Sequence, residues 1–464
     1  MEPLTPLATA FLDAEDEDPS CSLAIGALAV FEGPAPDFEE FVRAIEGRLP
    51  LLPRYRQKLR TVPLDLVPPV WSADPEFDVR WHIRNTALPA PGGREELGRL
   101  MARVMGARMD RGRPLWEYWF VEGLADGRWA FISKLHHSMV DGVSGSDIFR
   151  LVLDPTPEPR EGVEDHWEPE AAPSVLVMAA RSLRQLATWP LTTARLLTGS
   201  LRSPRALVRR AGRTALGLAT LSRAAAPASS SSLVGPIGQA RRYTWTTVPL
   251  DDIRTVRHAL GGTINDVALT LVSGGFRELL LSRGETPTPH MLRSLVPVST
   301  RQPGRESVPD NQVSLMLPYL PADIADPVKR LHAVRERIAK LRAEHEPEAG
   351  QSITTIAEHS PFAPVALGIR LAFHLPQRQI VTVTTNVPGP RLTLYALGRE
   401  MVQLMPFVPI ADRVRIGVAM YSYRGRLAFG ITGDYDTVPD IEVLATGIDR
   451  SMEQLLTASH HQPA

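Results

Sequence analysis

A pair of adjacent histidines, closely followed by an aspartate and a glycine, constrains this chain more than any other feature. The motif, His-His-x-x-x-Asp-Gly, occupies residues 136–142. Residues 129–135 before it have the apolar content of a buried strand. Residues 143–153 after it have the apolar spacing of a helix. The motif is therefore expected where a strand ends and a turn begins, which is a common place for reactive side chains in α/β proteins.

The two histidines should differ in role. Neighbouring side chains on an extended backbone point to opposite faces, so one of His136 and His137 can face a cleft while the other is held in the core by a hydrogen bond. The same geometry argues against both rings binding one metal ion, and no metal or cofactor is predicted. A histidine has an ordinary pKa of about 6.5, so a neutral imidazole is available near pH 7 to accept a proton. The pair predicts a general base, and a satisfied core histidine is the structural alternative.

The rest of the motif suggests a turn and no covalent nucleophile. The Asp141 carboxylate can hold the turn by pairing with an arginine. Gly142 allows a positive φ or a close backbone approach. Residues 142–146 do not form a Gly-x-Ser-x-Gly elbow, and Cys21, the single cysteine, has no comparable context. The economical mechanism is direct transfer, in which a histidine deprotonates a hydroxyl that attacks a carrier-bound acyl group.

Length and composition indicate a two-domain globular protein. The chain has 464 residues, of which 44% are hydrophobic and 22% charged. We expect an N-terminal α/β domain over residues 1–170, a basic helical crossover over 171–240, and a C-terminal α/β domain over 241–464. A net charge of −1 excludes a global field that would attract nucleic acid.

The expected location is the cytoplasm, at the surface of the inner membrane or of lipid droplets. One cysteine fits a reducing compartment, and neither a signal peptide nor a run of about 20 apolar residues is present. Residues 171–250 contain no acidic residue and carry arginines among apolar residues at helical spacing. They are either helices packed on the body with a solvated basic face, or a cationic surface that lies on a membrane or lipid droplet.

Two asparagines complete the candidate site. Asn265 and Asp266 follow Thr263 in a capping box that opens an apolar helix. Capping alone explains the pair about as well as a functional role, in which the asparagine amide or the helix N-terminus faces the negative charge that develops on an acyl oxygen. Asn386 lies where a predicted strand over 381–384 breaks at residues 385–390.

These landmarks together resemble the bacterial wax ester synthase/acyl-CoA:diacylglycerol acyltransferase family. The resemblance runs over almost the whole chain and rests on the following segments: Ala10 to Glu15, Pro114-Leu115-Trp116, His136 to Gly142, Asn265-Asp266, Val296 to Arg301, and Asn386-Val387-Pro388-Gly389-Pro390. The histidine motif alone is shared with peptide-synthetase condensation domains. The other segments narrow the resemblance to the acyltransferase family.

The resemblance implies a fold similar to chloramphenicol acetyltransferase, with two α/β halves and an active-site tunnel between them. It implies that His137 is the general base, that His136 supports it, and that Asp141 holds the loop, with Arg54 or Arg56 as its partner. Further site residues are carried over from the family: catalytic Gly142 and Asn265, and substrate-binding Asp266 and Asn386. Pro114, Leu115 and Trp116 form a motif that is either structural or substrate-binding, as the lining of an acyl pocket.

The implied reaction joins an acyl group from acyl-CoA to a lipid alcohol, with no cofactor besides this co-substrate. Diacylglycerol would give triacylglycerol, and a long-chain alcohol would give a wax ester. Two other functions stay open at this point. One is a condensation-type acyltransferase that takes its acyl group from a carrier protein, and the other is a non-catalytic lipid-droplet coat protein that uses residues 171–250 alone.

Overall fold

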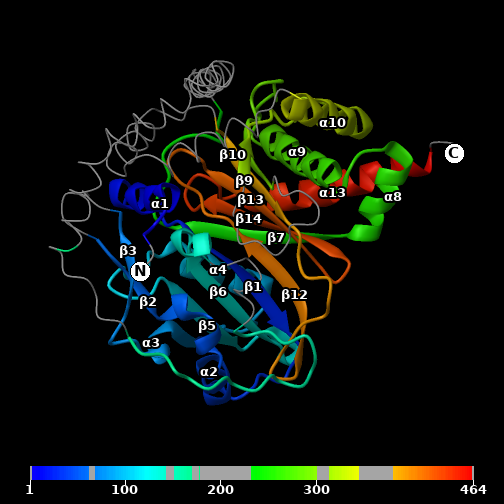
Figure 1. The fold of residues 1–464 in the computed structure, drawn as a ribbon. Coiled ribbons are helices and arrows are strands. Elements are labelled where there is room, and N and C mark those ends of the chain that lie inside the picture. Colours follow the sequence, from blue (N-terminus) through cyan, green and yellow to red (C-terminus); the bar gives the residue numbers. More distant parts are fainter. Residues whose placement is uncertain are drawn as a thin grey trace, which may run out of the picture.

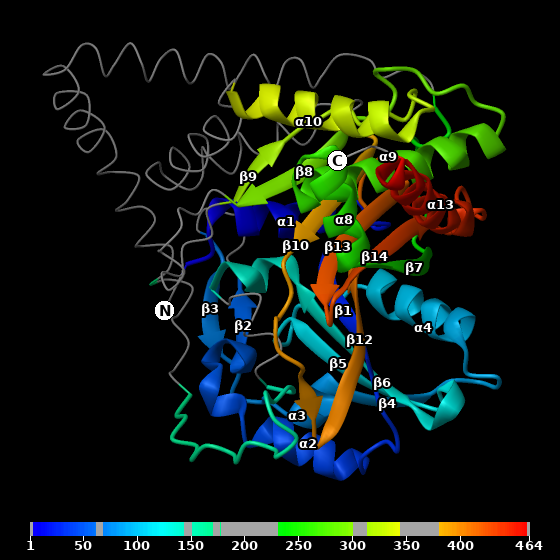
Figure 2. The ribbon, with the colours of Figure 1, turned by 90° about the vertical axis from the view of Figure 1, so that its right-hand side faces the viewer.

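The computed structural model describes residues 3–61, 68–142, 151–169, 177, 231–299, 313–343 and 380–461. Within these residues the chain forms two six-stranded mixed sheets and one small two-stranded sheet, with helices packed around them (Figure 1). Figure 2 shows the two large sheets in separate halves of the molecule, with α4 between them.

The first sheet contains the histidine strand, β6, near its centre. Its strand order is β11-β12-β1-β6-β5-β4, and only β4 and β5 are parallel. The strands are β1 (Ala24–Phe31), β4 (Ile83–Ala87), β5 (Trp116–Glu122), β6 (Trp129–His136), β11 (Tyr395–Ala396) and β12 (Arg399–Phe407). Because β6 is bonded on both sides, by β1 and β5, the backbone that presents the histidines is rigidly held.

Short elements surround this sheet. They are α1 (Pro6–Glu17), α2 (Phe38–Glu46), α3 (Val79–His82), α4 (Arg94–Gly106), η1 (Leu49–Leu51), η2 (Pro53–Arg56), η4 (Ala125–Gly127), η5 (His137–Gly142), β2 (Gln57–Arg60) and β3 (Val70–Ala73). The Asp37 side chain caps α2 by accepting the N–H of Glu40, as its sequence predicts. The sequence at residues 125–128 also predicts a hairpin turn before β6, and the turn is present, with Asp126 and Gly127 both at positive φ.

The second sheet lies in the C-terminal half, with strand order β7-β14-β13-β10-β8-β9. Its strands are β7 (Arg241–Pro249), β8 (Ser294–Ser299), β9 (Val313–Met316), β10 (Thr382–Val387), β13 (Ile416–Tyr423) and β14 (Arg426–Asp434). The helices of this half are α8 (Leu250–Leu260), α9 (Ile264–Ser282), α10 (Pro327–Ala343) and α13 (Ile441–His460). Helices α9 and α13 pack side by side against the sheet and share one apolar core with it (Figure 1).

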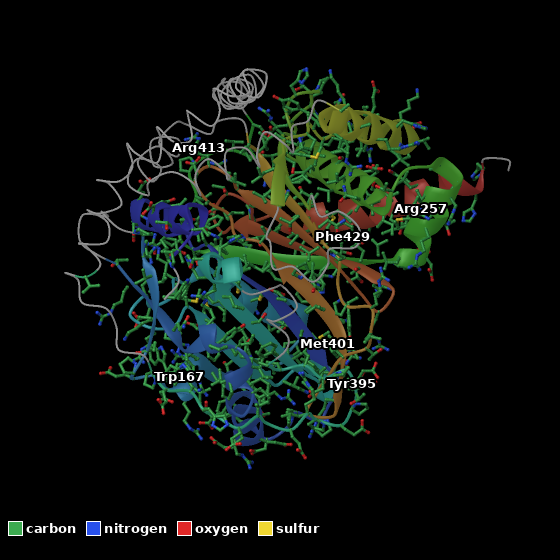
Figure 3. All side chains as sticks on the ribbon, in the orientation of Figure 1. Trp167, Arg257, Tyr395, Met401, Arg413 and Phe429 are labelled. Atoms are coloured by element: carbon green, nitrogen blue, oxygen red, sulfur yellow. The ribbon has the colours of Figure 1, made fainter. Side chains whose placement is uncertain are left out.

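Strand β12 joins the two halves, because it comes from the C-terminal half but pairs with β1 in the first sheet. Figure 3 shows Met401 of β12 in the lower half and Phe429 of β14 in the upper half, and both side chains are fully buried. At the end of β12, the Pro406 carbonyl accepts the Tyr243 hydroxyl of β7 at 2.8 Å. A Cβ at Gly430 would lie 1.8 Å from the same oxygen, so only glycine lets β12 pass so close to β14. The sheets therefore do not divide strictly at the expected boundary near residue 241.

Three sequence predictions about element boundaries were wrong. Leu151 and Val152 lie in a turn rather than at the end of a helix over 143–153, while 143–150 lie outside the described residues. Strand β10 continues through Asn386 to Val387, because its parallel pairing with β13 extends that far. The sequence predicts a terminal helix over 439–456 and a frayed tail over 459–464, whereas the final helix continues to His460.

The basic crossover predicted over 171–240 lies outside the described residues, except for Val177 and 231–240. Residues 231–240 contain no helix, and the next nine residues form β7. Tyr243 and Trp245 of β7 are buried between α4 and the sheets. The end of the arginine-rich segment 171–250 is thus part of the fold and cannot serve as a surface anchor.

The exposed chain after the histidine motif is attached to the first domain by buried charges. The Asp154 carboxylate accepts Arg48 Nη2 at 2.9 Å and Arg160 Nε at 2.7 Å. Further along, Asp165 pairs with Arg56 at 2.8 Å. Residues 154–169 therefore follow a defined path, although they have the sequence of an exposed linker.

Candidate active site

The two histidines leave β6 in different environments, as expected from their adjacency. The His136 N–H donates to the Leu115 carbonyl at 2.9 Å, and the His137 N–H donates to the Leu23 carbonyl at 3.1 Å. His136 is buried, with 1% of its surface exposed, whereas His137 keeps part of its surface accessible. Of the two residues, only His137 therefore keeps part of its surface exposed.

The His136 imidazole is fixed by its neighbours in the chain. Its Nδ1 accepts the N–H of Ser138 at 3.1 Å and lies 2.7 Å from the Ser138 hydroxyl. Its Nε2 faces the Glu15 carboxylate at 3.4 Å. These contacts lock the ring into the core and leave it unable to reach a substrate.

The His137 imidazole is kept neutral by its surroundings. The Phe11 ring of α1 lies against it, with 4.1 Å between ring centroids. Burial, with a smaller electrostatic contribution from the neighbouring His136, lowers the pKa of His137 to about 4 from its ordinary value of 6.5. The ring is thus almost entirely unprotonated at neutral pH, but it is a weak base.

The Pro114-Leu115-Trp116 segment supports the histidine strand. All three residues are buried, and the Leu115 carbonyl holds the His136 backbone. Trp116 Nε1 donates to the Tyr55 carbonyl at 2.8 Å, and its ring stacks on His82 with 4.4 Å between centroids. His82 is a core histidine, since its Nδ1 lies 2.8 Å from the Trp116 carbonyl and burial lowers its pKa to about 4.

Asp141 and Gly142 lie at the end of η5, and their surroundings are outside the described residues. Of the two arginines predicted as partners of Asp141, Arg56 is already paired with Asp165, and Arg54 places its guanidinium 4.6 Å from the Trp71 ring centroid. The pairing of Asp141 stays a prediction.

Asn265 and Asn386 come together on the second sheet. Asn386 Nδ2, near the end of β10, donates to Asn265 Oδ1, in the first turn of α9, at 3.0 Å. The predicted capping box is present, because Asp266 accepts the N–H and hydroxyl of Thr263 at 2.9 and 2.8 Å. The Asp266 carboxylate is therefore committed to the cap. Within the described residues, no hydrogen bond joins the asparagine pair to His136 or His137.

Close packing against β13 explains why the fourth residue of the Asn-Val-Pro-Gly-Pro segment, Gly389, is a glycine. The Gly389 N–H donates to the Ser422 hydroxyl at 3.0 Å, and a Cβ at Gly389 would lie 1.7 Å from the Ser422 carbonyl oxygen. The loop after Asn386 can lie this close to β13 only without a side chain. The segment thereby holds the end of β10 and its asparagine in place.

Sequence reasoning missed the contribution of α1. Phe11 and Glu15 are four residues apart, so they lie on one face of the helix, and each contacts one histidine of the motif. An aromatic and an acid at this spacing were the available signal, but nothing local indicates their partner. Elsewhere in the described ranges, no group of three or more His, Cys, Asp or Glu side chains could hold a metal ion.

Comparisons with known proteins agree with this arrangement. Residues 4–268 match the family model described as the wax ester synthase/diacylglycerol acyltransferase catalytic domain, and residues 310–456 match the C-terminal domain of the same family. A Mycobacterium tuberculosis protein named as a probable diacylglycerol O-acyltransferase is 43% identical over 460 residues, which cover 99% of this chain and 96% of that protein. A second protein of this species, named as a putative diacylglycerol O-acyltransferase, is 33% identical over 478 residues. The alignment covers 99% of this chain and 92% of that protein.

Solved structures confirm the predicted fold class. The wax ester synthase/diacylglycerol acyltransferase from Marinobacter aquaeolei VT8 is similar with a TM-score of 0.67 and 26% identity, covering 99% of this chain and 100% of that one. The first condensation domain of the CDA synthetase has a TM-score of 0.58 at 14% identity, and the match covers 98% of this chain and 95% of that domain. The fold is the chloramphenicol-acetyltransferase-like arrangement of two α/β halves.

Proposed function

This chain belongs to the wax ester synthase/diacylglycerol acyltransferase family and is an acyltransferase, and we propose how its residues carry the transfer. The acyl group passes from acyl-CoA to the hydroxyl of a lipid alcohol, with His137 as general base and without a covalent acyl-enzyme. Diacylglycerol or a long-chain alcohol is the acceptor, and the names of the mycobacterial relatives favour diacylglycerol. No cofactor is needed besides the co-substrate acyl-CoA.

One observation carries the assignment of the base. Of two adjacent histidines, His136 is enclosed by Ser138 and Glu15, while His137 is partly exposed as a residue and has a ring that is uncharged at neutral pH. A group that takes a proton from a substrate must be both reachable and unprotonated. Only His137 meets both requirements.

The transfer then proceeds in balanced steps. His137 accepts the proton of the alcohol as its oxygen attacks the thioester carbonyl, and a tetrahedral oxyanion forms. When this intermediate collapses, the carbon–sulfur bond breaks and the CoA thiolate takes the proton back from the His137 imidazolium. Because a base with a pKa near 4 provides little driving force, oxyanion stabilisation and positioning must lower most of the barrier.

The asparagine pair is our candidate for oxyanion stabilisation. Since Asn386 occupies the Asn265 oxygen, the Asn265 amide presents its N–H groups away from the pair. An amide held in this way is a preorganised donor of the kind that stabilises a developing alkoxide. In this proposal Asn265 donates, Asn386 orients it, and Asp266 holds the helix start from which it projects.

The pH dependence of the rate tests the base. Since the neutral ring is active and the pKa of His137 is lowered to about 4, kcat/KM should stay level from pH 8 down to about pH 5. Below pH 4 it should fall about tenfold for each pH unit. An inflection near the ordinary value of 6.5 would contradict the proposed environment of the ring.

Acid unfolding must be separated from this effect. In the folded protein the pKa values of His82 and His137 lie below 6.5, so protonation favours the unfolded chain and stability declines as pH falls from about 6.5 toward 4. Circular dichroism at each pH identifies the range in which the protein stays folded and the rates are valid.

An assay with purified protein tests the substrate class. Acyl-CoA is mixed with either diacylglycerol or hexadecanol, without any carrier protein, and the esters are separated by thin-layer chromatography. Ester formation supports the proposal, and the faster acceptor identifies the preferred alcohol. Product that forms only from a carrier-protein-bound acyl group would favour the condensation-type reaction.

Attachment to a membrane or lipid droplet is proposed for the arginine-rich residues 171–230, on the basis of their sequence alone. Among the described residues, no helix has the length and apolar character needed to cross a bilayer. Co-sedimentation of the full chain with anionic vesicles, lost at high salt and absent with neutral vesicles, would support a cationic surface contact.

A further inference from the structure

The buried carboxylate of Glu15 lies beside the active site and has no role in the reaction described above. Glu15 is in the last turn of α1, and 3% of its surface is exposed. A carboxylate this deeply buried is costly unless it is paired and hydrogen-bonded. Its contacts therefore indicate what it does there.

The two Glu15 oxygens contact three different elements. Oε1 accepts the Leu23 N–H at 2.6 Å and lies 3.4 Å from His136 Nε2. Oε2 accepts Arg111 Nη2 at 3.2 Å. Burial alone would raise the pKa of Glu15, but the His136 ring, the Leu23 N–H and Arg111 together lower it to about 2. The group is thus a carboxylate at neutral pH.

The hydrogen bonds of His136 define its tautomer. Nδ1 accepts the Ser138 N–H, and a backbone N–H can only donate, so Nδ1 carries no proton in the neutral ring. The proton must then be on Nε2. This atom is buried and forms no hydrogen bond within the described residues, and its ionic contact is with Glu15. The Glu15 carboxylate therefore faces Nε2–H, the single N–H group of the neutral His136 ring.

Glu15 also reaches His137 through the backbone. The Leu23 N–H that Glu15 accepts belongs to the residue whose carbonyl accepts the His137 N–H at 3.1 Å. On the same face of α1, Phe11 packs against the His137 ring. One carboxylate thus links α1, the segment before β1, and both histidines.

We propose that Glu15 is a positioning residue that, together with the Ser138 N–H, stabilises the Nε2–H tautomer of His136 and holds the His137 backbone where its ring can act as the base. The inference rests on the proposed function of His137. Glu15 does not touch the substrate, and no proton leaves His136 during the reaction. The general precedent is the carboxylate that orients a catalytic or metal-bound histidine and sets its tautomer.

Glu15→Gln tests this assignment, because glutamine keeps the size of the side chain and loses the charge. With acyl-CoA and the better acceptor, kcat should fall roughly 10- to 100-fold, the usual range for loss of such a supporting contact. The KM values should change by less than about threefold, since no substrate contact is removed. Asp16→Asn is the matched control, because Asp16 is exposed on the same helix and also pairs with Arg111, at 2.8 Å. It should keep the wild-type kcat.

A spectroscopic measurement separates this proposal from the reaction itself. In protein labelled with ¹⁵N-histidine, the His136 signals, identified by their loss in His136→Asn, should report a proton on Nε2 in the wild type. In Glu15→Gln the Nε2 signal should shift, because the carboxylate that this atom faces is lost, while Nδ1 stays unprotonated against the Ser138 N–H. This result stands even if the acyl transfer is different from the one proposed. Unchanged kcat together with unchanged ¹⁵N shifts would overturn the role of Glu15 and leave the function of His137 intact.

If Glu15→Gln does not fold, Glu15→Asp decides the question. Aspartate keeps the charge but is one methylene shorter, so it cannot hold both Leu23 and His136. A several-fold loss of kcat at unchanged KM supports positioning, and a wild-type kcat overturns it.

Discussion

His137→Ala should lower kcat by about 10²- to 10⁴-fold, the usual contribution of a positioned general base. The reason is that the adjacent His136 cannot replace it, since His136 is enclosed by Ser138 and Glu15. The rate of ester formation from acyl-CoA and the preferred alcohol measures the effect, with direct CoA binding as the second measurement. CoA binding should stay measurable, because the variant removes a proton acceptor and no charged contact.

His258→Ala is the control for this variant. His258 is exposed on α8 and should keep the wild-type rate and melting temperature. A His137→Ala protein that melts normally and retains more than about a tenth of the wild-type rate would exclude His137 as the base, given the expected contribution of such a group.

Asp154→Ala should lower the free energy of unfolding by about 3–5 kcal/mol, the typical cost of leaving a buried charge unpaired. The side chain of Arg48 is 2% exposed, and Asp154 is the carboxylate that pairs with it. The other groups that accept hydrogen bonds from the Arg48 guanidinium are the carbonyls of Leu151 and Arg160, and both are neutral. Urea unfolding at pH 7 measures the loss.

Glu39→Ala is the matched comparison, because it also removes the carboxylate partner of an arginine. Arg80 and Glu39 lie 2.6 Å apart, but their side chains are 58% and 53% exposed. Exposed pairs contribute little to stability because water screens them, so this variant should unfold almost like the wild type. If the two variants lose the same free energy of unfolding, burial of the Arg48–Asp154 pair does not increase its contribution to stability.

Local signals explain which parts of the structure could be predicted from the sequence. The Asp37 cap and the capping box at Thr263 each depend on residues only a few positions apart. The different environments of His136 and His137 follow from the alternation of side chains on a strand. The resemblance to the family led to the fold class, which local patterns alone did not define.

What could not be predicted depends on partners that are distant in the sequence. Helix α1 carries Asp16 and Glu17 at its C-terminal end, where the helix dipole disfavours acids, so its sequence is a weak helix signal. Arg111 pairs with Asp16, and Arg108 donates to the Glu15 and Asp18 carbonyls at the helix end, but both arginines lie almost a hundred residues away. The contact between Glu15 and His136 has the same character. No spacing rule connects the two residues, because the fold brings them together.

The origin of β12 also affects the order in which this protein is built on the ribosome. The nascent chain emerges with β1 already available, but residues 399–407, which cover its free edge, are synthesised near the end. Pairings between such distant segments form slowly, because a very long loop must close first. Until then the strand beside the histidine strand exposes unpaired backbone groups, a template for unwanted association with other chains. The catalytic half therefore cannot mature during translation ahead of the rest, and chaperones that shield β1 would help to produce the enzyme.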